Sequence, residues 1–175
     1  MVRYHASGMR LQIDSDDSYL SVRKSRRRVG GHYYLSKKAN RTKPPTKPTP
    51  NEVLHALYIT LRNVMASAVE DELGALFYNG QVDGPICTCL EEMGYPQPST
   101  PIKTDNSTAA GIVNSSIRHK KSKAMDIRFY WVKYRVSQKY LLVYWESGLS
   151  NKGDCYTKHF PTSHHVHVHL QYVHR

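Results

Sequence analysis

Acidic residues gather in four short segments of this 175-residue chain, and together they could bind divalent metal ions. The segments are 14–17, 70–72, 104–106 and 153–155, and they hold eight of the fourteen Asp and Glu residues. Two unpaired carboxylates about 4 Å apart repel each other by roughly 4 kcal/mol at an effective dielectric constant of 20. Converging acids therefore favour hard cations such as Mg²⁺ or Mn²⁺ between them. Two such ions can activate a water molecule and stabilise the leaving oxygen in phosphodiester hydrolysis.

The second acidic segment lies on a predicted helix, and this decides which of its side chains could face a metal. Ser67 and Glu70 form the S-x-x-E pattern of a capping box, so we expect the Glu70 side chain to cap the helix. Asp71 lies nearly opposite the apolar face of the helix, and we expect it to be solvated. Glu72 borders that face and is the better ligand. In the first acidic segment, spacing does not choose among Asp14, Asp16 and Asp17.

Apolar periodicity and capping signals predict nine elements that would position these acids. Strands are predicted at 9–14, at 32–35 after a Gly30-Gly31 turn, at 53–61, at 101–104 and at 140–145. Helices are predicted from Ser67, after a cap at Asn106 or Ser107, from about Ala124, and from Asp154. The order strand, strand, strand, helix, strand, helix, helix, strand, helix indicates an α/β fold, in which a mixed sheet carries helices on its faces. Four prolines in 43–50 predict an extended surface loop.

The overall composition favours a polyanionic partner. The chain has 25 Lys and Arg residues, a formal net charge of +11 and an isoelectric point near 9.6, and basic side chains bind nucleic acid by neutralising phosphates. A length of 175 residues allows one well-buried domain, which we predict at 1–160, followed by a His-rich tail at 161–175. We expect the tail to be flexible. The alternative is a zinc or nickel site, because side chains at alternate strand positions share a face.

Other features of the chain argue against several classes of protein. No stretch approaches the about 20 apolar residues that a membrane span requires, and the N-terminus lacks the apolar core of a signal peptide. We therefore predict an intracellular protein, cytoplasmic or nuclear, that is not secreted and has no membrane partner. The three cysteines, Cys87, Cys89 and Cys155, include no C-x-x-C pair, which argues against a disulfide framework and a Cys-based zinc site.

Five stretches between residues 9 and 160 together resemble one known family. Residues 11–31 contain Ser-Asp-Asp-Ser-Tyr-Leu-Ser at 15–21 and lead into Gly-Gly-His-Tyr-Tyr-Leu-Ser at 30–36, and residues 66–76 contain an E-x-E helix. Residues 103–110 carry a strand-to-helix D-N motif, 118–131 a basic segment before a helix, and 152–158 a sequence similar to A-D-x-x-T-K. In this order they resemble the ribonuclease H domain of copia-type (LTR) retrotransposon polyproteins.

The resemblance implies a fold, an activity and a set of site residues. The fold would be ribonuclease H-like, with a mixed five-stranded sheet of three antiparallel strands and then parallel strands, and helices on both faces. Asp16, Glu72, Asp105 and Asp154 would be the catalytic acids and would hold two Mg²⁺ ions, with Mn²⁺ as an alternative. The activity would be cleavage of the RNA strand of an RNA/DNA hybrid during reverse transcription. A reverse transcriptase domain of a longer polyprotein would be a second partner.

Nucleic-acid contacts are expected from basic side chains and helix N-termini, because such a hybrid is recognised through its backbone and 2′-hydroxyl groups. Solvated charge is the alternative for the two basic clusters, and helix capping for the two polar residues. The candidates are Arg23, Lys24, Arg26, Arg27, Arg28, Asn106, Ser107, Arg118, Lys120, Lys121 and Lys123. Tyr130, Trp131 and Trp145 could stack on a base or sugar, but we expect them to pack in the core or at its rim.

A second hypothesis is a degenerate retroelement remnant that binds nucleic-acid backbone without cleaving it, and Gly153 and the additional acids Asp14 and Asp17 support it. Gly153 stands where the family has Ala, and its backbone freedom could loosen the start of the helix at Asp154. Residues 146–152 contain no His where some ribonucleases H have a mobile one. An integrase-like strand transferase is disfavoured, because its last acid is usually Glu and here it is Asp154.

Overall fold

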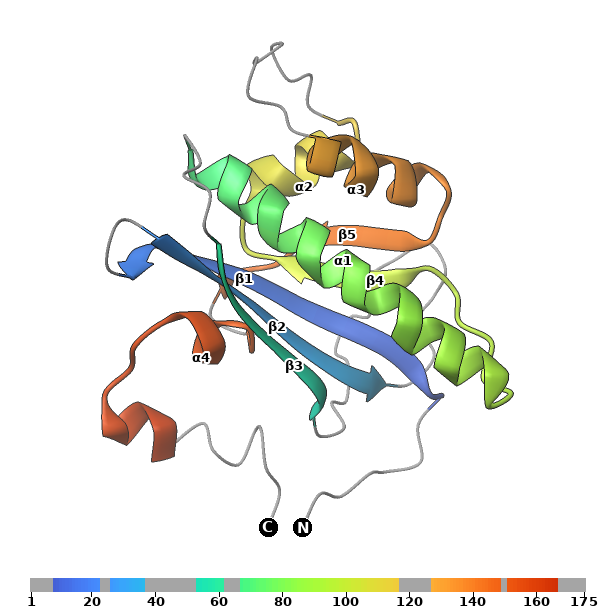
Figure 1. Ribbon diagram of the computed structural model, residues 1–175, viewed down its shortest axis with the longest axis horizontal. Helices are drawn as coiled ribbons and strands as arrows, with labels where there is room; N and C mark the ends of the chain where they lie inside the picture. Colours follow the sequence, from blue (N-terminus) through green and yellow to red (C-terminus); the bar gives the residue numbers. More distant parts are fainter. Residues whose placement is uncertain are drawn as a thin grey trace.

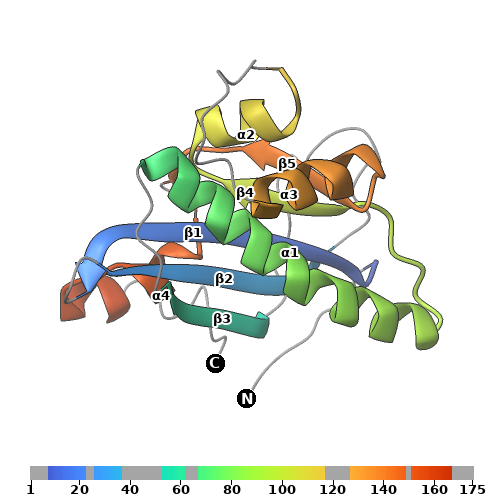
Figure 2. The same ribbon diagram turned by 45° about the horizontal axis from the view of Figure 1, so that its top comes forward.

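A mixed five-stranded sheet forms the centre of the molecule, and helices cover both of its faces (Figures 1 and 2). The computed structural model describes residues 8–22, 26–36, 53–61, 67–116, 127–148 and 151–166. The elements in chain order are β1 (Arg10–Val22), β2 (Arg26–Ser36), β3 (Val53–Leu61), α1 (Ala68–Glu92), β4 (Thr100–Thr104), α2 (Ser107–Val113), α3 (Ile127–Ser137), β5 (Leu141–Trp145) and α4 (Asp154–Thr157). The predicted order of nine elements is confirmed.

The sheet has the order β3-β2-β1-β4-β5. β1, β2 and β3 are joined antiparallel, whereas β4 runs parallel to both β1 and β5. Helices α1, α2 and α3 lie on one face, and the short helix α4 packs on β1, β2 and β3 from the other face (Figures 1 and 2). This is the predicted arrangement of three antiparallel strands followed by parallel ones.

The main core fills the space between the sheet and helices α1 to α3. Leu11 and Ile13 of β1 pack there with Leu73 and Leu76 of α1, and Phe129 and Val132 of α3 belong to the same cluster. The predicted starting point of that helix, near Ala124, lies outside the described residues. A second, smaller cluster joins Val29, Leu61 and Ala75 beneath the outer strands. Helix α1 therefore buries a wider face than its apolar pattern predicts.

The predicted turn at Gly30-Gly31 is wrong, because both glycines lie inside strand β2, where they pair with Asp16 and Ser15 of β1. A Cβ atom added at Gly30 would lie 2.7 Å from Thr157 Cγ2, on the α4 side of the sheet. A Cβ atom added at Gly31 would lie 1.9 Å from Asn79 Oδ1, on the α1 side. These glycines therefore allow a helix to approach the sheet closely on each face.

The parallel pairing of β1 with β4 brings two acidic segments to the same level of the sheet. Asp14 pairs with Lys103, so Asp16 and Asp105 each follow two residues later along neighbouring strands. β4 ends at Thr104, and Asn106 caps α2 by accepting a 3.0 Å hydrogen bond from Ala109 N. The predicted strand end and cap are confirmed. Asp105 consequently lies in the short connection between a buried strand and a helix.

Parts of two other predicted segments can be compared with the structure. Residues 162–166 at the start of the tail are helical, and the His164 ring stacks on Phe160, so a strand-like alternation of histidines is wrong for these residues. Residues 167–175 and the Pro-rich 43–50 lie outside the described residues. Cys87, Cys89 and Cys155 are not joined in disulfides. Among the described helices, none has the length and apolar character needed to cross a membrane.

Candidate metal centre

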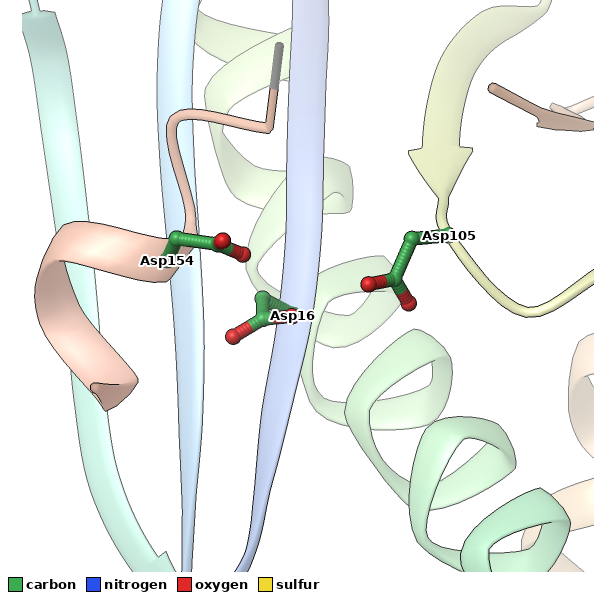
Figure 3. Close-up of side chains that lie close together, drawn as sticks. All are labelled: Asp16, Asp105 and Asp154. Carbon is green, nitrogen blue, oxygen red and sulfur yellow. The ribbon is translucent and has the colours of Figure 1, made fainter. Parts of the chain in front are cut away.

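Three aspartates from three different elements converge at one end of the sheet (Figure 3). Asp16 lies on β1, Asp105 follows β4, and Asp154 begins α4; one carboxylate oxygen from each lies within 4.8 Å of the others. Asp16 is buried and the other two are partly buried. The Trp145 indole of β5 fixes the connection after β4 by donating a 3.0 Å hydrogen bond to the carbonyl oxygen of Asp105. This is the arrangement that a small, hard cation requires.

The electrostatics of Asp16 indicate that the cluster carries more negative charge than its neighbours offset. Burial, followed by the charge of Asp154, raises the pKa of Asp16 to about 8. The Thr157 hydroxyl, which donates to Asp16, and the Lys158 ammonium act in the opposite direction but do not offset these effects. Oxygen ligands with excess negative charge suit Mg²⁺ and Mn²⁺. The three aspartates are therefore chemically suited to a divalent ion.

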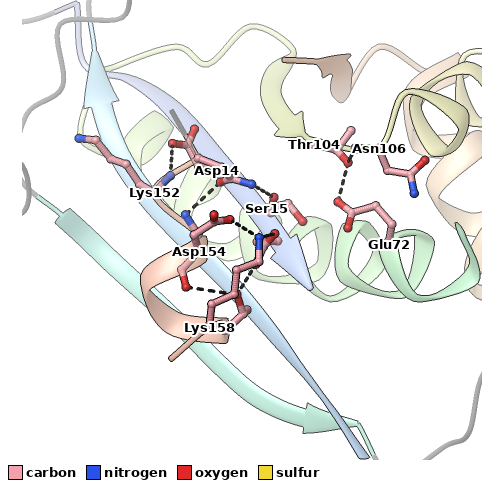
Figure 4. A network of polar contacts seen from close by, with 12 residues as sticks. Asp14, Ser15, Glu72, Thr104, Asn106, Lys152, Asp154 and Lys158 are labelled. Carbon is pink, nitrogen blue, oxygen red and sulfur yellow. Dashed lines mark hydrogen bonds and ion pairs between the residues drawn. The ribbon is translucent and has the colours of Figure 1, made fainter. Parts of the chain in front are cut away.

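Glu72, the fourth predicted acid, lies beside this cluster and not within it (Figure 4). It is fully buried on α1 and accepts a hydrogen bond from Thr104 Oγ1. Its pKa is raised well above the ordinary value by burial, and further by a hydrogen bond and charge repulsion from Asp17. Glu72 and Asp17 therefore lie next to each other on the α1 side of β1. One cavity of about 460 Å³ is lined by Asp16, Asp17, Glu72 and Asp105. The carboxyl groups of Asp17 and Glu72 therefore border the aspartate cluster.

The structure distinguishes the three acids of the first segment, which sequence spacing left open. Asp14 is buried in an ion pair with Lys103 at 3.0 Å and accepts a hydrogen bond from Lys152 N. Asp16 faces α4, while Asp17 faces Glu72 on the opposite side of the sheet. Asp17 lies inside strand β1. It is a site residue that the sequence reasoning missed, although its position next to Asp16 offered a signal.

The segment before Asp154 is attached to β1 by side chains that were not predicted to take part. The buried Asn151 donates from Nδ2 to the carbonyl oxygen of Ser15 at 2.8 Å, and its Oδ1 accepts from Gly153 N at 3.0 Å. Thr157 and Lys158, three and four residues after Asp154, both contact Asp16. Their helical spacing from Asp154 is the signal that could have identified them.

Gly153 has a packing role that contradicts a loosened helix start. Its φ of −59° and ψ of −31° are helical values that any residue can adopt. A Cβ atom at this position would lie 2.9 Å from Asp16 Cβ and 3.1 Å from Asp16 N. The glycine is therefore needed because α4 passes directly over β1, and this close approach holds Asp154 next to Asp16.

Replacing Gly153 by Ala should move Asp154 away from Asp16 and weaken Mn²⁺ binding by roughly tenfold, at a cost of about 1 to 3 kcal/mol in stability from overpacking. Calorimetric titration with Mn²⁺ and urea unfolding would measure both effects. Gly84→Ala is the matched control, because its new Cβ would meet nothing closer than Arg135 Nη2 at 3.9 Å. Equal Mn²⁺ affinity in Gly153→Ala and the wild type would contradict the close-packing role.

A buried histidine of β2 contacts helix α4 through a tyrosine hydroxyl. His32 of β2 is fully buried, and its Nδ1 lies 3.0 Å from the Tyr156 hydroxyl. Burial, with smaller contributions from the charges of Lys152 and Lys103, lowers the pKa of His32 to about 3. The unfolded chain therefore binds a proton near pH 6.5 that the folded protein does not bind, and stability is lost as the pH falls below that value.

Between pH 7 and pH 5, the wild type should lose about 2 kcal/mol of unfolding free energy relative to a His32→Gln variant. Urea unfolding at the two pH values measures this difference directly. The comparison between the variants removes the contribution of the carboxyl groups, because these are present in both proteins. Parallel pH dependences would show that folding does not change the pKa of His32.

The predicted solvation of Asp71 and the predicted nucleic-acid contact of Arg27 need correction, because these two side chains form a buried ion pair. Their side chains are only 2% and 1% exposed. Asp71 is thus not solvated, and the Arg27 side chain is unavailable for a phosphate contact. The reason is that the first turn of α1 packs over β2, where Asp71 lies one turn before the buried Ala75. The predicted N-cap is confirmed, since Ser67 Oγ accepts from Glu70 N.

The other candidates for nucleic-acid contacts are described only in part. Arg28 is half-buried near the aspartate cavity, with Nη1 3.0 Å from His159 Nε2 and its guanidinium over the Tyr58 ring. Asn106 caps α2, and Ser107 is exposed at the first position of that helix. Arg26 begins β2, but its side chain is not described. The remaining candidates lie outside the described residues: Arg23, Lys24, Arg118, Lys120, Lys121 and Lys123.

The three candidate stacking residues lie in different environments. Trp131 is partly buried against Phe77 of α1, as expected for a core position. Tyr130 and Trp145 are exposed, by 60% and 55% respectively.

A larger cavity of about 910 Å³ lies at the other end of the sheet, near the start of β4 and β5. It is distant from the carboxylate cluster, so we assign the chemistry to the smaller cavity.

Comparison with known proteins establishes the fold as ribonuclease H-like. The N-terminal RNase H domain of Rv2228c from Mycobacterium tuberculosis superposes with a TM-score of 0.56 at 12% identity, over 85% of this chain and 91% of that one. LC11-RNase H1, isolated from compost by a metagenomic approach, gives 0.58 at 13% identity, over 85% and 93%. The same enzyme in complex with an RNA/DNA hybrid gives 0.54 at 10% identity, over 84% and 93%. No family model and no curated protein matches the chain.

Proposed function

We propose that this protein is a metal-dependent endonuclease that cleaves the RNA strand of RNA/DNA hybrids. The observation that carries the proposal is the convergence of Asp16, Asp105 and Asp154 to within 4.8 Å in a ribonuclease H-like fold. A structural neighbour bound to an RNA/DNA hybrid supports this substrate class. The net charge of +11 favours a polyanion.

Two Mg²⁺ ions, or Mn²⁺ in their place, are the proposed cofactors. Asp16, Asp105 and Asp154 would hold them, and Glu72, which lines the same cavity, would join the ligands. The chemistry of the donors fits this assignment, because the cluster consists of hard oxygen ligands and the pKa of Asp16 is raised by burial and then by the charge of Asp154. Bound ions of this kind activate water and stabilise the leaving oxygen of a phosphodiester.

The chain's own residues would orient the substrate and keep the acids in place. Asn151 and Gly153 hold the start of α4 against β1, and Trp145 holds the connection that carries Asp105. Arg28 lies on the rim near His159 and would contact a phosphate of the hybrid, as would the exposed first turn of α2. We also propose phosphate contacts for the basic residues outside the described ranges, including 118–123.

The origin of the chain in a copia-type retrotransposon is part of the same proposal, and it rests on the motifs along residues 9–160. In that setting the enzyme would act during reverse transcription, and a reverse transcriptase domain would be its partner. The division into a domain at 1–160 and a tail at 161–175 belongs to this proposal as well.

A labelled RNA/DNA hybrid tests the proposed activity. With Mg²⁺ the purified protein should cut the RNA strand, leave the DNA strand intact and produce 5′-phosphate and 3′-hydroxyl ends. A chelator should stop the reaction, and added Mg²⁺ should restore it. An RNA duplex and a DNA duplex of the same sequence are the matched controls. Equal cleavage of all three substrates would contradict the substrate class.

A second candidate function is binding to nucleic-acid backbone without cleavage. Glu72 favours it, because this residue is engaged with Thr104 and Asp17 outside the three-aspartate cluster. A correctly folded protein that binds the hybrid in a salt-sensitive manner, but does not cut it with either Mg²⁺ or Mn²⁺, would support this alternative.

A further inference from the structure

A lysine side chain contacts the candidate metal ligands directly. Lys158 follows helix α4, and its Nζ lies 2.9 Å from Asp154 Oδ1 and 3.4 Å from Asp16 Oδ1 (Figure 4). These two carboxylates belong to the three-aspartate cluster. The ammonium group therefore occupies coordination positions that a divalent ion bound to Asp16 and Asp154 would need.

The position of Lys158 in the chain holds its ammonium group near the acids. It lies four residues after Asp154, which places both side chains on the same side of the short helix. Its backbone N–H donates to Asp154 O, so the stem of the side chain starts next to the cluster. The side chain is 38% exposed, and its four-carbon stem can turn toward solvent without disturbing the buried core.

The charge balance explains why an ammonium group is held at this point. Asp16 is buried, and its pKa is raised by burial and by the charge of Asp154, whereas Lys158 opposes this rise. The positive charge of Lys158 thus offsets part of the repulsion among the acids in the absence of metal. A bound divalent ion would offset it more strongly, and repulsion between the two cations would then drive the ammonium group away.

We propose that Lys158 is an internal counter-cation that a divalent ion must displace from Asp16 and Asp154. This inference rests on the proposed function, because it requires the aspartate cluster to be a metal site. Lys158 stabilises the acids before metal enters and lowers the apparent affinity for that metal. The residue therefore sets the metal concentration at which the site is filled.

Calorimetric titration with Mn²⁺ tests the competition directly. Lys158→Met should bind Mn²⁺ about tenfold more tightly than the wild type, because the charge is lost and the stem is kept. Lys158→Arg keeps the charge and should bind within about twofold of the wild type. Lys152→Met is the matched control, since it removes a lysine of the same segment whose Nζ lies over the Tyr34 ring. This control should change the affinity much less than Lys158→Met.

A second measurement follows the lysine itself. Acetylation of Lys158 by a water-soluble reagent, quantified by mass spectrometry, should become several-fold faster when Mn²⁺ is added, because the displaced ammonium group is exposed. Acetylation of the exposed Lys139 should not change. Circular dichroism would establish that the variants are folded.

The outcomes separate the two proposals. Equal or weaker Mn²⁺ binding by folded Lys158→Met would overturn the counter-cation role and leave the metal site standing. Absence of Mn²⁺ binding in the wild type and in Lys158→Met would contradict the metal site itself, and with it the proposed function. Tighter binding in Lys158→Met together with faster acetylation in the wild type would support both.

Discussion

Asp105→Asn should reduce cleavage of an RNA/DNA hybrid by about 10³-fold or more and leave the fold intact. The substitution keeps the size of the side chain and removes one of the three carboxyl groups that face the proposed metal site. Asp105 lies in the connection between β4 and α2, and its side chain is not part of the buried core. The loss should therefore appear in activity and in Mn²⁺ affinity, with little change in unfolding free energy.

Glu92→Gln is the matched control for this prediction, because it removes one carboxylate charge from an exposed position at the end of α1. Initial cleavage rates at saturating Mg²⁺ should be the same in this control as in the wild type. If Asp105→Asn retained wild-type cleavage, the aspartate cluster could not be the catalytic centre. If both variants lost activity, a general charge effect would explain the result.

Arg27→Met should destabilise the protein by about 3 to 5 kcal/mol, because it leaves the Asp71 carboxylate buried without its cation. The double variant Arg27→Met, Asp71→Leu should recover most of this loss, since well-packed apolar side chains often replace a buried ion pair at little cost. Urea unfolding of the wild type, both single variants and the double variant gives the coupling energy between the two residues.

Hybrid binding provides a separate readout for Arg27. A phosphate contact would lower the slope of log K against log salt by about one when the arginine is removed. Because Arg27 is buried, we expect the slope to be unchanged in the double variant, which keeps the fold. A reduced slope there would restore Arg27 as a phosphate ligand. Arg28→Met is the comparison, since Arg28 lies near the aspartate cavity and should lower the slope.

Much of the fold could be predicted because local signals and packing agree along most of the chain. The alternation at 9–14, the serine before α1 and the asparagine before α2 mark element boundaries with side chains whose roles are local. The turn predicted at the glycine pair of β2 is wrong. These glycines are required because Asn79 and Thr157, which are distant in sequence, pack directly against them. A close approach between elements leaves no local pattern beyond the glycines themselves.

The candidate site was predictable in its acids but not in their grouping. Residue types and the family resemblance selected Asp16, Glu72, Asp105 and Asp154, and the structure brings three of them together. Asp16 and Asp17 point to opposite sides of the sheet, because neighbouring side chains of a strand alternate. Glu72 lies beside Asp17, and it is therefore separate from the cluster that contains Asp16. The burial of Asp71 was missed for a similar reason, because the partner that neutralises it comes from β2.

The contact between Gly31 and Asn79 has a consequence for the evolution of the chain. Asn79 donates from Nδ2 to Ser15 Oγ and Gly30 O, and its Oδ1 accepts from the Tyr33 hydroxyl, so the amide links two strands to α1. No side chain fits at position 31 while that amide remains, because the first added carbon would overlap with it. Homologues should therefore exchange both positions together or neither. Such a correlated pair would identify distant relatives whose overall identity is too low for recognition.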